Sequence, residues 1–513
     1  MGSKQISLNL PTDHTKDELK KKIQQKLKIK EFTFQIEKKS LDARRKSNIH
    51  WQLLISVSSK HLKGTSVPSP PLLNIPYRKR KEKTAVIGSG PAGFFCALIL
   101  QKAGFNTTLI ERGMDVKKRT EAIKLFEKTG QFDPVSNYAF GEGGAGTFSD
   151  GKLTSRSKHM LQEGKFILSS YIDAGAPEEI AYMAHPHLGS DNLCRIVKNL
   201  RENFLNIGGK ILFETLAEDI NIENQTVKEL ITTSGNIKAD KFIFAPGHSA
   251  YETYKMLIKR GVKFRSKSFA IGCRVEHPQE LINYAQWGKK NLPGVKAAEY
   301  RLTSQGNNTS PVYTFCMCPG GIIVPSSAYK NANIVNGMSL YQRAGKFANA
   351  ACVAGINLDK LTGKQISPTE ALYWLETLET KFYEFANSFK APFCTIKDFI
   401  KKEAASNTAP SSYPLGLTPA PLWELLPREI SNSIREGLKD FSKKIKGFET
   451  GTIIGLDSKS SSPIQALREE NHLSTGFKNL YLTGAASGYS GGIMSSAADG
   501  IKTAIAIIKS SSS

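Results

Sequence analysis

Thr84-Ala-Val-Ile-Gly88-Ser-Gly90-Pro-Ala-Gly93 is the stretch of this sequence that decides its fold. An apolar segment follows it, and Thr107-Thr-Leu-Ile-Glu111 comes next. The pattern predicts a strand, a glycine turn, a helix, a second strand and a terminal acid. Gly88 allows the tight turn, Gly90 lets the backbone approach a diphosphate, and Gly93 lets the helix pack on the sheet. The stretch therefore predicts a dinucleotide-binding unit.

The same unit supplies a first set of predicted binding residues. The N-terminus of the helix would face the phosphates with free N–H groups and a partial positive charge. The acid that ends the second strand would accept the hydroxyls of the adenosine ribose. No second complete glycine fingerprint follows in the sequence. The residues expected to bind the dinucleotide here are Gly88, Ser89, Gly90, Pro91, Ala92, Gly93, Glu111 and Arg112.

Length and composition are those of a globular protein. The chain has 513 residues, 40% of them hydrophobic and 23% charged, which is enough for two or three domains. No apolar run reaches the roughly 18 residues that a membrane span needs, and the first residues lack a signal-peptide core. Seven scattered cysteines favour free thiols over a disulfide framework. We therefore expect a cytoplasmic protein without a membrane span.

The charge is strongly positive and unevenly distributed. The formal net charge is +24, and residues 1–84 contain 20 Lys and Arg against 7 Asp and Glu. One interpretation is attraction to RNA or another anionic partner through the N-terminal unit. The other is a lysine-rich solvated surface without a partner, since no aromatic residues alternate with the basic ones. The sequence leaves both interpretations open.

The order of predicted elements suggests an α/β protein assembled from distant pieces. Residues 1–63 read as a small α+β domain, and residues 64–83, with four prolines, as a linker. Short strands at 210–214, 217–222 and 227–233 precede a buried strand ending at Gly247, which is typical of FAD-binding folds. A last strand at 479–483 leads into a glycine turn and a helix. We therefore predict a FAD-binding Rossmann-like domain, three-layered ββα, at 84–264 and 436–513, interrupted by an inserted α+β substrate domain at 265–435.

Several long strings give the chain a recognisable pattern. They are Ser40-Leu-Asp-Ala-Arg-Arg-Lys46, Phe140-Gly-Glu-Gly-Gly-Ala-Gly-Thr-Phe-Ser-Asp-Gly-Lys-Leu153, Ala245-Pro-Gly-His-Ser249, Phe269-Ala-Ile-Gly-Cys-Arg-Val-Glu-His-Pro278, Tyr313-Thr-Phe-Cys-Met-Cys-Pro-Gly-Gly321 and Gly488-Tyr-Ser-Gly-Gly492. With these strings the chain resembles, over nearly its whole length, the bacterial FAD-dependent dehydrogenases of the glutathione-reductase-type flavoprotein superfamily. The resemblance implies non-covalent FAD, redox chemistry and a ferredoxin-like small domain. It does not supply a substrate.

The resemblance extends the set of predicted cofactor-binding residues. Related folds place their glycine-dense segment against the flavin or a phosphate, and the N-terminus of their last helix at the flavin O2 side. The residues implied are Gly143, Gly144, Ala145, Ala217, Gly247, Gly484, Gly488, Tyr489, Gly491, Gly492 and Ile493. One departure is Gly484-Ala-Ala486, where such families usually have an acid for a ribityl hydroxyl. Another is Asp457-Ser-Lys-Ser460, where Glu-Thr-Arg-Thr is expected.

The candidate catalytic residues are Lys152, His248, Cys316 and Cys318. A lysine near flavin N1 or N5 could stabilise negative charge on the reduced ring. The two cysteines could form a redox pair or simply pack beneath the flavin. A metal site is not predicted, because two further soft ligands are lacking nearby.

Histidines are the other candidate proton donors. They are His185, His187, His248 and His277, of which His248 and His277 lie in the family-like strings. A lone histidine is more often structural than catalytic. Arg274, two residues before Glu276, could form a plain ion pair with it.

Three functions follow from these patterns. The first is a FAD-dependent oxidoreductase that transfers hydride through flavin N5 to or from a small-molecule substrate, with NAD(P)H as a possible transient donor. The second is a flavoprotein that binds or modifies RNA through its basic N-terminal unit. The third is a flavin-containing structural or regulatory protein without catalysis.

Overall fold

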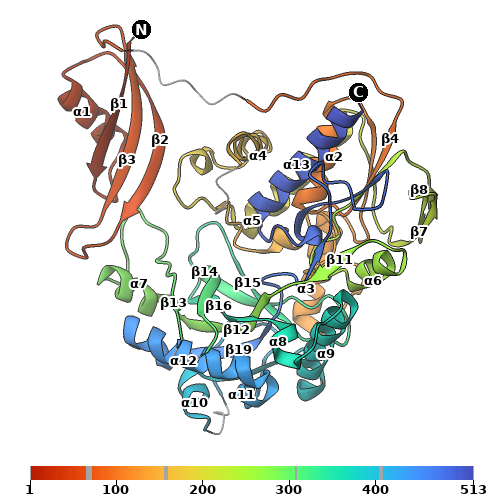
Figure 1. Cartoon of the computed structure of the whole chain (residues 1–513). Coiled ribbons are helices and arrows are strands. Elements are labelled where there is room, and N and C mark those ends of the chain that lie inside the picture. Colours follow the sequence, from red (N-terminus) through yellow and green to blue (C-terminus); the bar gives the residue numbers. More distant parts are fainter. Residues whose placement is uncertain (1, 65–71, 155–159, 307–308, 404–407, 512–513) are drawn as a thin grey trace.

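The fold is seen in a computed structural model that describes residues 2–64, 72–154, 160–306, 309–403 and 408–511 (Figure 1). Part of the predicted linker, residues 65–71, lies outside the described residues. No helix in the described ranges is long and apolar enough to cross a membrane.

A five-stranded parallel sheet forms the predicted dinucleotide unit. Its strand order is β21-β10-β4-β5-β6, so the last strand of the chain lies beside strands of the first half. The bounds are β4 (Lys83–Ile87), β5 (Asn106–Ile110), β6 (Lys210–Leu212), β10 (Lys241–Phe244) and β21 (Leu480–Leu482). The predicted strands at 84–87, 107–110 and 479–483 are thereby confirmed.

Helices cover one face of this sheet. α2 (Pro91–Lys102) begins with proline at its first position, where its fixed φ suits a helix start. Every residue from Ala92 to Leu100 is buried, because α13 (Ile493–Ser510), α4 (Leu161–Asp173) and α5 (Gly189–Asn206) pack with it over the sheet. Figure 1 shows α2 and α13 side by side. The two ends of the predicted FAD-binding domain therefore share one core.

A β-meander covers the opposite face. It consists of β7 (Ala217–Glu223), β8 (Thr226–Thr232) and β9 (Gly235–Ile237). Ala85 and Ile87 of β4 pack with Ile220 and Leu230 of the meander, while Val86 packs with the helices. Because successive side chains of a strand point to opposite faces, β4 is buried on both sides. The arrangement has the three layers, meander, sheet and helices, that the sequence predicts.

A large, mainly antiparallel sheet forms the second half of the molecule. Its order is β13-β14-β16-β12-β19-β17-β18, with β15 paired to β14. The bounds are β12 (Phe269–Pro278), β13 (Thr303–Ser304), β14 (Val312–Pro325), β15 (Val335–Ser339), β16 (Phe347–Ile356), β17 (Ala391–Thr395), β18 (Leu417–Pro419) and β19 (Thr452–Asp457). α12 (Arg428–Lys444) packs on this sheet. The sheet thus continues past residue 435, and the predicted domain boundary falls inside α12.

The N-terminal unit is a small sheet with one helix. β1 (Gly2–Leu10), β2 (Thr33–Asp42) and β3 (His50–Ser59) pair antiparallel in the order β1-β3-β2, and α1 (Lys16–Leu27) covers one face. This βαββ order lacks the second helix and fourth strand of a ferredoxin-like unit. The Lys39 backbone N–H donates to the carbonyl of Tyr182 (2.8 Å), which joins the unit to the rest of the molecule.

Shorter elements complete the described fold. β11 (Phe264–Ser266) pairs with β20 (Ile464–Ala466) beneath the loop that precedes α13. The remaining helices are α3 (Val116–Thr129), α6 (Tyr251–Lys259), α7 (Gln279–Trp287), α8 (Leu358–Thr362), α9 (Pro368–Ala386), α10 (Ile396–Lys401) and α11 (Leu422–Leu425), with 3₁₀ turns η1 (Ala145–Phe148), η2 (Glu178–Ala181), η3 (Phe448–Thr450) and η4 (Gly484–Ser487).

Candidate flavin site

Two glycine segments meet at the N-terminus of α2. Gly88 has a φ of +103°, and a Cβ there would collide with the carbonyl oxygen of Ala245. A Cβ on Gly90, by contrast, would have only the Cα of Gly144 nearby, at 3.8 Å. A Cβ on Gly144, where φ is +65°, would come within 2.9 Å of the Gly90 Cα. The backbones of the two segments therefore lie close together, beside the free N–H groups that begin α2.

The C-terminal glycine segment reaches the same place. A Cβ on Gly484 would collide with the Ala92 side chain, and a Cβ on Gly146 would come within 3.1 Å of Ile493. A pocket lies at the junction of the segments and α5. Its lining combines Ser89, Pro91, Gly143, Gly146 and Ile493 with mainly apolar side chains of α2, α5 and the neighbouring strands. The structure thus brings together predicted residues from both ends of the chain. The close backbone approach places the N-termini of α2 and α13 beside the glycine-dense segment.

Glu111 ties the first two segments together. One carboxylate oxygen accepts from the Ser89 N–H (2.9 Å) and hydroxyl (2.6 Å). The other accepts from the N–H groups of Gly113 (2.9 Å) and Gly141 (3.1 Å). A carboxylate has about four acceptor positions, so all are occupied by protein donors. A ribose hydroxyl would have to replace one of them.

Other predicted cofactor residues lie nearby in different settings. Arg112 forms an ion pair with Glu252 of α6, and its guanidinium lies over the Phe140 ring at 3.7 Å from the ring centroid. Ala217 is buried where β7 pairs with β8. The Tyr489 side chain is exposed and lies under the guanidinium of Arg468. The Gly247 carbonyl accepts from the Tyr254 hydroxyl (2.6 Å).

Asp499 of α13 compensates in part for the acid missing after Gly484. Its carboxylate accepts from the Gly484 N–H (2.7 Å), from the Thr483 hydroxyl (3.0 Å) and from Arg468 (2.7 Å). The acid therefore stabilises the glycine turn from beneath, within the protein. A ribityl hydroxyl of FAD would have backbone groups of this turn as its nearest partners.

His248 lies beside the start of α13 with an unsatisfied ring nitrogen. Its Nε2 is buried and has no hydrogen-bond partner among the described residues, and its Cε1 lies 4.0 Å from the Cβ position of Gly491. Burial, with the charges of Lys459 and Lys267, lowers the pKa of His248 to about 4. The imidazole is therefore neutral near pH 7. An orphaned donor or acceptor at this place fits a ligand with polar ring atoms.

Two lysines lie near His248, and neither is a candidate site residue from the sequence alone. The Lys267 ammonium donates to the Gly488 carbonyl (2.5 Å), and burial lowers its pKa. Lys459, inside the Asp457-Ser-Lys-Ser460 string, pairs with Glu379 (2.8 Å) and donates to the Tyr251 hydroxyl. Lys267 lies in the β11–β12 connection and Lys459 in the β19–β20 connection. Only the fold places these connections beside α13.

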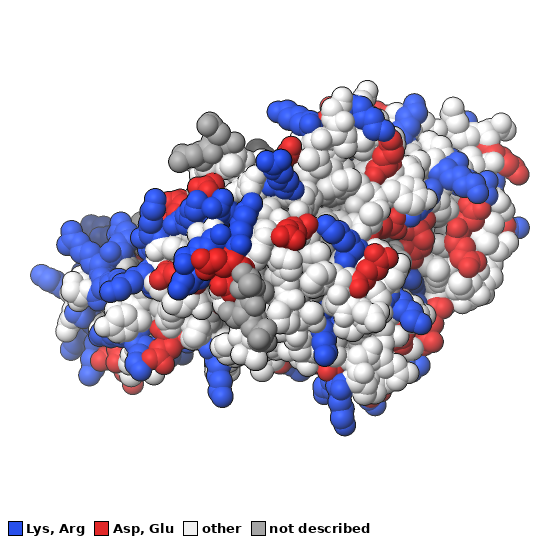
Figure 2. All heavy atoms as spheres, turned by 90° about the horizontal axis from the view of Figure 1, so that it is seen from below, with Lys and Arg blue, Asp and Glu red and all other residues white. Residues whose placement is uncertain are grey.

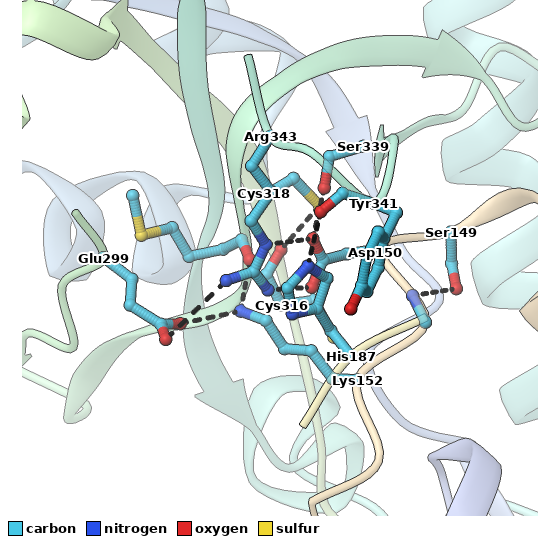
Figure 3. A network of polar contacts seen from close by, with 12 residues as sticks. Ser149, Asp150, Lys152, His187, Glu299, Cys316, Cys318, Ser339, Tyr341 and Arg343 are labelled. Carbon is cyan, nitrogen blue, oxygen red and sulfur yellow. Dashed lines mark hydrogen bonds and ion pairs between the residues drawn. The ribbon is translucent and has the colours of Figure 1, made fainter. Parts of the chain in front are cut away.

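A buried polar network joins the glycine-dense segment to the large sheet (Figure 3). The Asp150 carboxylate accepts from Arg343 through Nε (3.0 Å) and Nη2 (2.6 Å), and also from the Ser339 hydroxyl. Burial opposes ionisation of Asp150, but Arg343 and Lys152 outweigh it, and the pKa of Asp150 is lowered overall. Arg343 was not predicted from the sequence. The ion pair fixes the segment that carries Lys152.

Lys152 points into the same network. Its ammonium donates to the Met317 carbonyl and lies 3.5 Å from the Glu299 carboxylate. Arg343 lies 3.8 Å from the other Glu299 oxygen (Figure 3). Burial raises the pKa of Glu299, but the charges of Lys152 and Arg343 lower it by more. The pKa of Glu299 is therefore lowered overall. Lys152 and Glu299 thus form an ion pair beside Met317 of β14.

The two cysteines lie beside Lys152 as protonated thiols. Cys316 is exposed, with a φ of +40°, whereas Cys318 is buried. Desolvation nevertheless raises the pKa of the Cys316 thiol to about 12. Burial raises the pKa of Cys318 to about 11. Thiolates are the reactive forms, so this environment does not favour a thiol–disulfide couple.

The predicted pairing of Arg274 with Glu276 is wrong. Arg274 is fully buried and pairs with Asp457 of β19 (2.9 Å), while a second nitrogen donates to the Cys316 carbonyl (2.7 Å). Glu276 instead accepts from the Ser412 N–H (3.0 Å). Arg274 pairs in this way because its side chain extends across the sheet to the neighbouring strands instead of along β12, its own strand.

The other histidines are held by backbone carbonyls or exposed. His277 Nε2 lies 2.7 Å from the Phe448 carbonyl, and His187 Nε2 lies 3.0 Å from the Tyr341 carbonyl. Burial lowers the pKa of each to about 4. His185 is exposed. Of the four candidates, His248 alone adjoins the glycine segments of α2 and α13 in the described structure.

The basic surface gives no specific sign of a nucleic-acid site. Figure 2 shows Lys and Arg crowded over the side of the molecule that holds the N-terminal unit, with acidic residues among them and over the rest of this face. The exposed face of the N-terminal sheet carries polar, uncharged residues such as Gln5, Asn9 and Gln52 rather than aromatic stacking platforms. An RNA partner for this unit stays a prediction.

Comparisons with known proteins agree with the site. Residues 268–460 match the model of a family described as FAD-dependent protein, C-terminal domain-like, and residues 3–58 match a domain of unknown function, DUF8436. This part of the chain is therefore similar to the C-terminal domain of FAD-dependent proteins. An uncharacterized protein of Clostridium beijerinckii is 36% identical over 525 residues, which cover 98% of each chain. The chain belongs to the same family as that clostridial protein.

Solved structures with a similar arrangement are more distant. Glycine oxidase from Bacillus cereus is 13% identical, covers 84% of this chain and 96% of its own, and has a TM-score of 0.34. L-proline dehydrogenase from P. horikoshii is 14% identical, covers 85% and 94%, and has a TM-score of 0.36. CtdE in complex with FAD is 12% identical, covers 83% and 84%, and has a TM-score of 0.35. Likenesses this remote say nothing of the substrate.

Proposed function

We propose that this chain is a FAD-dependent oxidoreductase that holds one FAD non-covalently and transfers hydride between flavin N5 and a small-molecule substrate. The observation that carries the proposal is the meeting of three glycine segments, 88–93, 141–147 and 484–493, at the N-termini of α2 and α13. Two helix N-termini and closely approaching backbones suit a ligand with a diphosphate and a ring that becomes anionic. The match to a FAD-dependent family supports the choice of FAD.

Each part of FAD has a proposed partner in the chain. The diphosphate would lie over Gly90 and Gly144. The ribose would take the place of the Ser89 hydroxyl at the Glu111 carboxylate. The flavin ring would lie between η1, His248 and the start of α13, where the helix N-terminus favours negative charge near O2. Bound FAD would supply the two-electron carrier that the chain's own side chains cannot provide.

The surrounding side chains have distinct proposed roles. Lys152 would place a positive charge beside the ring and the substrate, and Glu299 would hold that ammonium in position. Neutral His248 would donate from one ring nitrogen and accept with the other. The protonated thiols of Cys316 and Cys318 would contribute S–H donors and packing. With one glycine fingerprint in the sequence, NAD(P)H would act as a transient donor that does not need a second Rossmann unit.

The test is spectroscopic and begins with the purified full chain. Flavin absorbance bands are expected, and denaturation should release FAD into the filtrate. Anaerobic mixing with NADH or NADPH, followed by organic acceptors, then measures reduction and reoxidation of the flavin. A protein that contains flavin but never exchanges electrons with any donor or acceptor would support the regulatory alternative. A protein that neither contains nor takes up FAD would contradict the proposal.

A further inference from the structure

Arg119 of α3 is completely buried, yet it faces backbone carbonyls instead of an acid. Its side chain has no exposed area. It donates to the carbonyl oxygens of Asn137 (2.9 Å), Tyr138 (3.0 Å), Gly141 (3.2 Å), Glu142 (2.8 Å) and Gly144 (2.9 Å). One guanidinium thus donates to five carbonyl oxygens of residues 137–144. These residues include the start of the glycine-dense segment of the site.

The charge of this guanidinium is not neutralised by a direct partner. Burial lowers the pKa of Arg119 to about 10, so it is protonated at neutral pH. Within the described residues it forms no ion pair. Glu142 pairs with Arg201 instead (3.0 Å), and burial raises the pKa of Glu142 to about 7. The carboxylates of Glu111 and Glu142 act on Arg119 without direct contact and offset the effect of burial only in part, so a further anion nearby would be favoured.

The carbonyl pattern also fixes where the N–H groups of the segment point. In a trans peptide the C=O and the following N–H point in opposite directions. Because the carbonyls of Glu142 and Gly144 face Arg119, the N–H groups of Gly143 and Ala145 face away from it. Neither N–H has a hydrogen-bond partner within the described part of the chain. The N–H of Gly144, between them in sequence, donates to the Gly141 carbonyl (2.9 Å), so the outward N–H groups are those of Gly143 and Ala145. Concave arrangements of backbone N–H groups bind anions.

We propose that Arg119 is a positioning residue for the FAD diphosphate, which it never touches. It holds the segment so that the Gly143 and Ala145 N–H groups face the diphosphate above Gly90, and its own charge lies behind them. Gly141 is required by the same arrangement, since a Cβ there would collide with the Arg119 side chain. The inference rests on the proposed FAD function and adds the half of the diphosphate site opposite the α2 N-terminus.

The test compares ligands with and without phosphate in matched variants. Arg119→Met removes the charge and the donors, Arg119→Lys retains the charge, and Lys118→Met makes the same charge change on the exposed face of α3. Equilibrium titration measures the affinity of each apoprotein for FAD and for riboflavin, which lacks phosphate. Thermal unfolding of each apoprotein checks the fold.

The expected result is a phosphate-specific loss. Arg119→Met should weaken FAD binding roughly 10- to 100-fold and leave riboflavin binding unchanged, with Arg119→Lys between it and the wild type. Lys118→Met should bind FAD like the wild type. Equal losses for FAD and riboflavin, or no loss in a folded variant, would overturn the inference.

A measurement on the unmodified protein covers the case in which the variants do not fold. Amide exchange of Gly143 and Ala145 should slow when FAD binds and should also slow with inorganic pyrophosphate alone. Unchanged exchange at both amides in FAD-saturated protein would overturn the inference. If the wild type does not bind FAD at all, the proposed function fails, and that outcome is distinct from the failure of Arg119 alone.

Discussion

At the scale of the residue, Gly88 and Gly90 differ in whether the fold itself requires glycine. Gly90 has a φ of −65°, which any residue can adopt, and a Cβ there would meet nothing closer than 3.8 Å. Gly88, two residues earlier, has a φ of +103° and no room for a Cβ. Glycine at 88 is therefore required by the protein itself, whereas the fold would accept a Cβ at 90 in ordinary contact with Gly144.

Gly90→Ala is expected to leave the fold intact and to weaken FAD binding. The added methyl group would occupy the space proposed for the diphosphate, and the affinity should fall at least 10-fold. Thermal unfolding of the apoprotein and FAD titration measure the two effects separately. Gly355→Ala, in an open position of β16, is the control and should alter neither. Wild-type FAD affinity in Gly90→Ala would show that no ligand approaches this backbone.

Lys152→Met is expected to slow flavin reduction more than it weakens FAD binding. The ammonium lies in the network with Glu299 and Arg343, where its loss leaves an acid with less positive charge around it (Figure 3). We expect the reduction rate constant to fall roughly 10- to 100-fold in stopped-flow experiments. Lys290→Met, which removes an exposed lysine paired with Glu280, is the control. Identical rates in Lys152→Met and the wild type would remove Lys152 from the proposed chemistry.

Sequence patterns identified residues that lie in local strings and missed those that only tertiary packing brings in. Lys152 follows a glycine-rich stretch and His248 lies in the Ala245–Ser249 string, so both are candidates from the sequence. Arg343 and Glu299 lie far from them in sequence and have no motif of their own. The pairing of Arg274 with Asp457 depends on which strands become neighbours, which a single strand's pattern does not contain.

At the scale of the element, the Asp150–Arg343 pair connects the glycine-dense segment to the loop between β15 and β16. Both side chains are about 95% buried, and Asp150 makes three hydrogen bonds to Ser339 and Arg343. Removal of one partner from such a pair leaves an uncompensated buried charge. The pair therefore helps to hold the two halves of the molecule together at the site.

Asp150→Asn is expected to lower the free energy of unfolding by about 3–5 kcal/mol. Asp219→Asn, which breaks the half-exposed pair with Arg260, should cost no more than about 1 kcal/mol. The double variant Asp150→Asn/Arg343→Met should recover part of the loss, because the orphaned charge is also removed. Urea unfolding measures all of these. Equal costs for Asp150→Asn and Asp219→Asn would contradict a structural role for the buried pair.

The elements of the dinucleotide unit were predictable because their signals are local. β4, α2 and β5 follow one after another, and glycines mark both ends of α2. The domain limits were harder. β19 is a buried strand of the large sheet that pairs with β12, about 180 positions earlier in the sequence. Its hydrophobic run fits either domain, so the sequence pattern alone placed the boundary inside α12.

At the scale of the whole molecule, buried histidines make stability depend on pH. Four of them, His187, His248, His277 and His472, have their pKa lowered to about 4 by burial. The unfolded chain binds more protons than the folded chain between about pH 4 and 6.5. Stability should therefore rise with pH through this window and be lost as the pH falls through it.

His277→Gln is expected to weaken this dependence. The histidine is fully buried, and its neutral form should contribute about 2 kcal/mol less to stability at pH 5 than at pH 7. Glutamine keeps a donor for the Phe448 carbonyl but does not titrate. Chemical unfolding at both pH values gives the difference for wild type and variant. An unchanged difference would show that His277 protonates in the folded protein without cost.

The central claim is that segments from both ends of the chain enclose a single FAD. Equilibrium dialysis of the apoprotein against FAD, followed by denaturation and chromatography of the released flavin, tests it most directly. The account predicts saturation at one FAD per chain, all of it released intact. Binding of no FAD, by a folded protein at flavin concentrations well above micromolar, would contradict it.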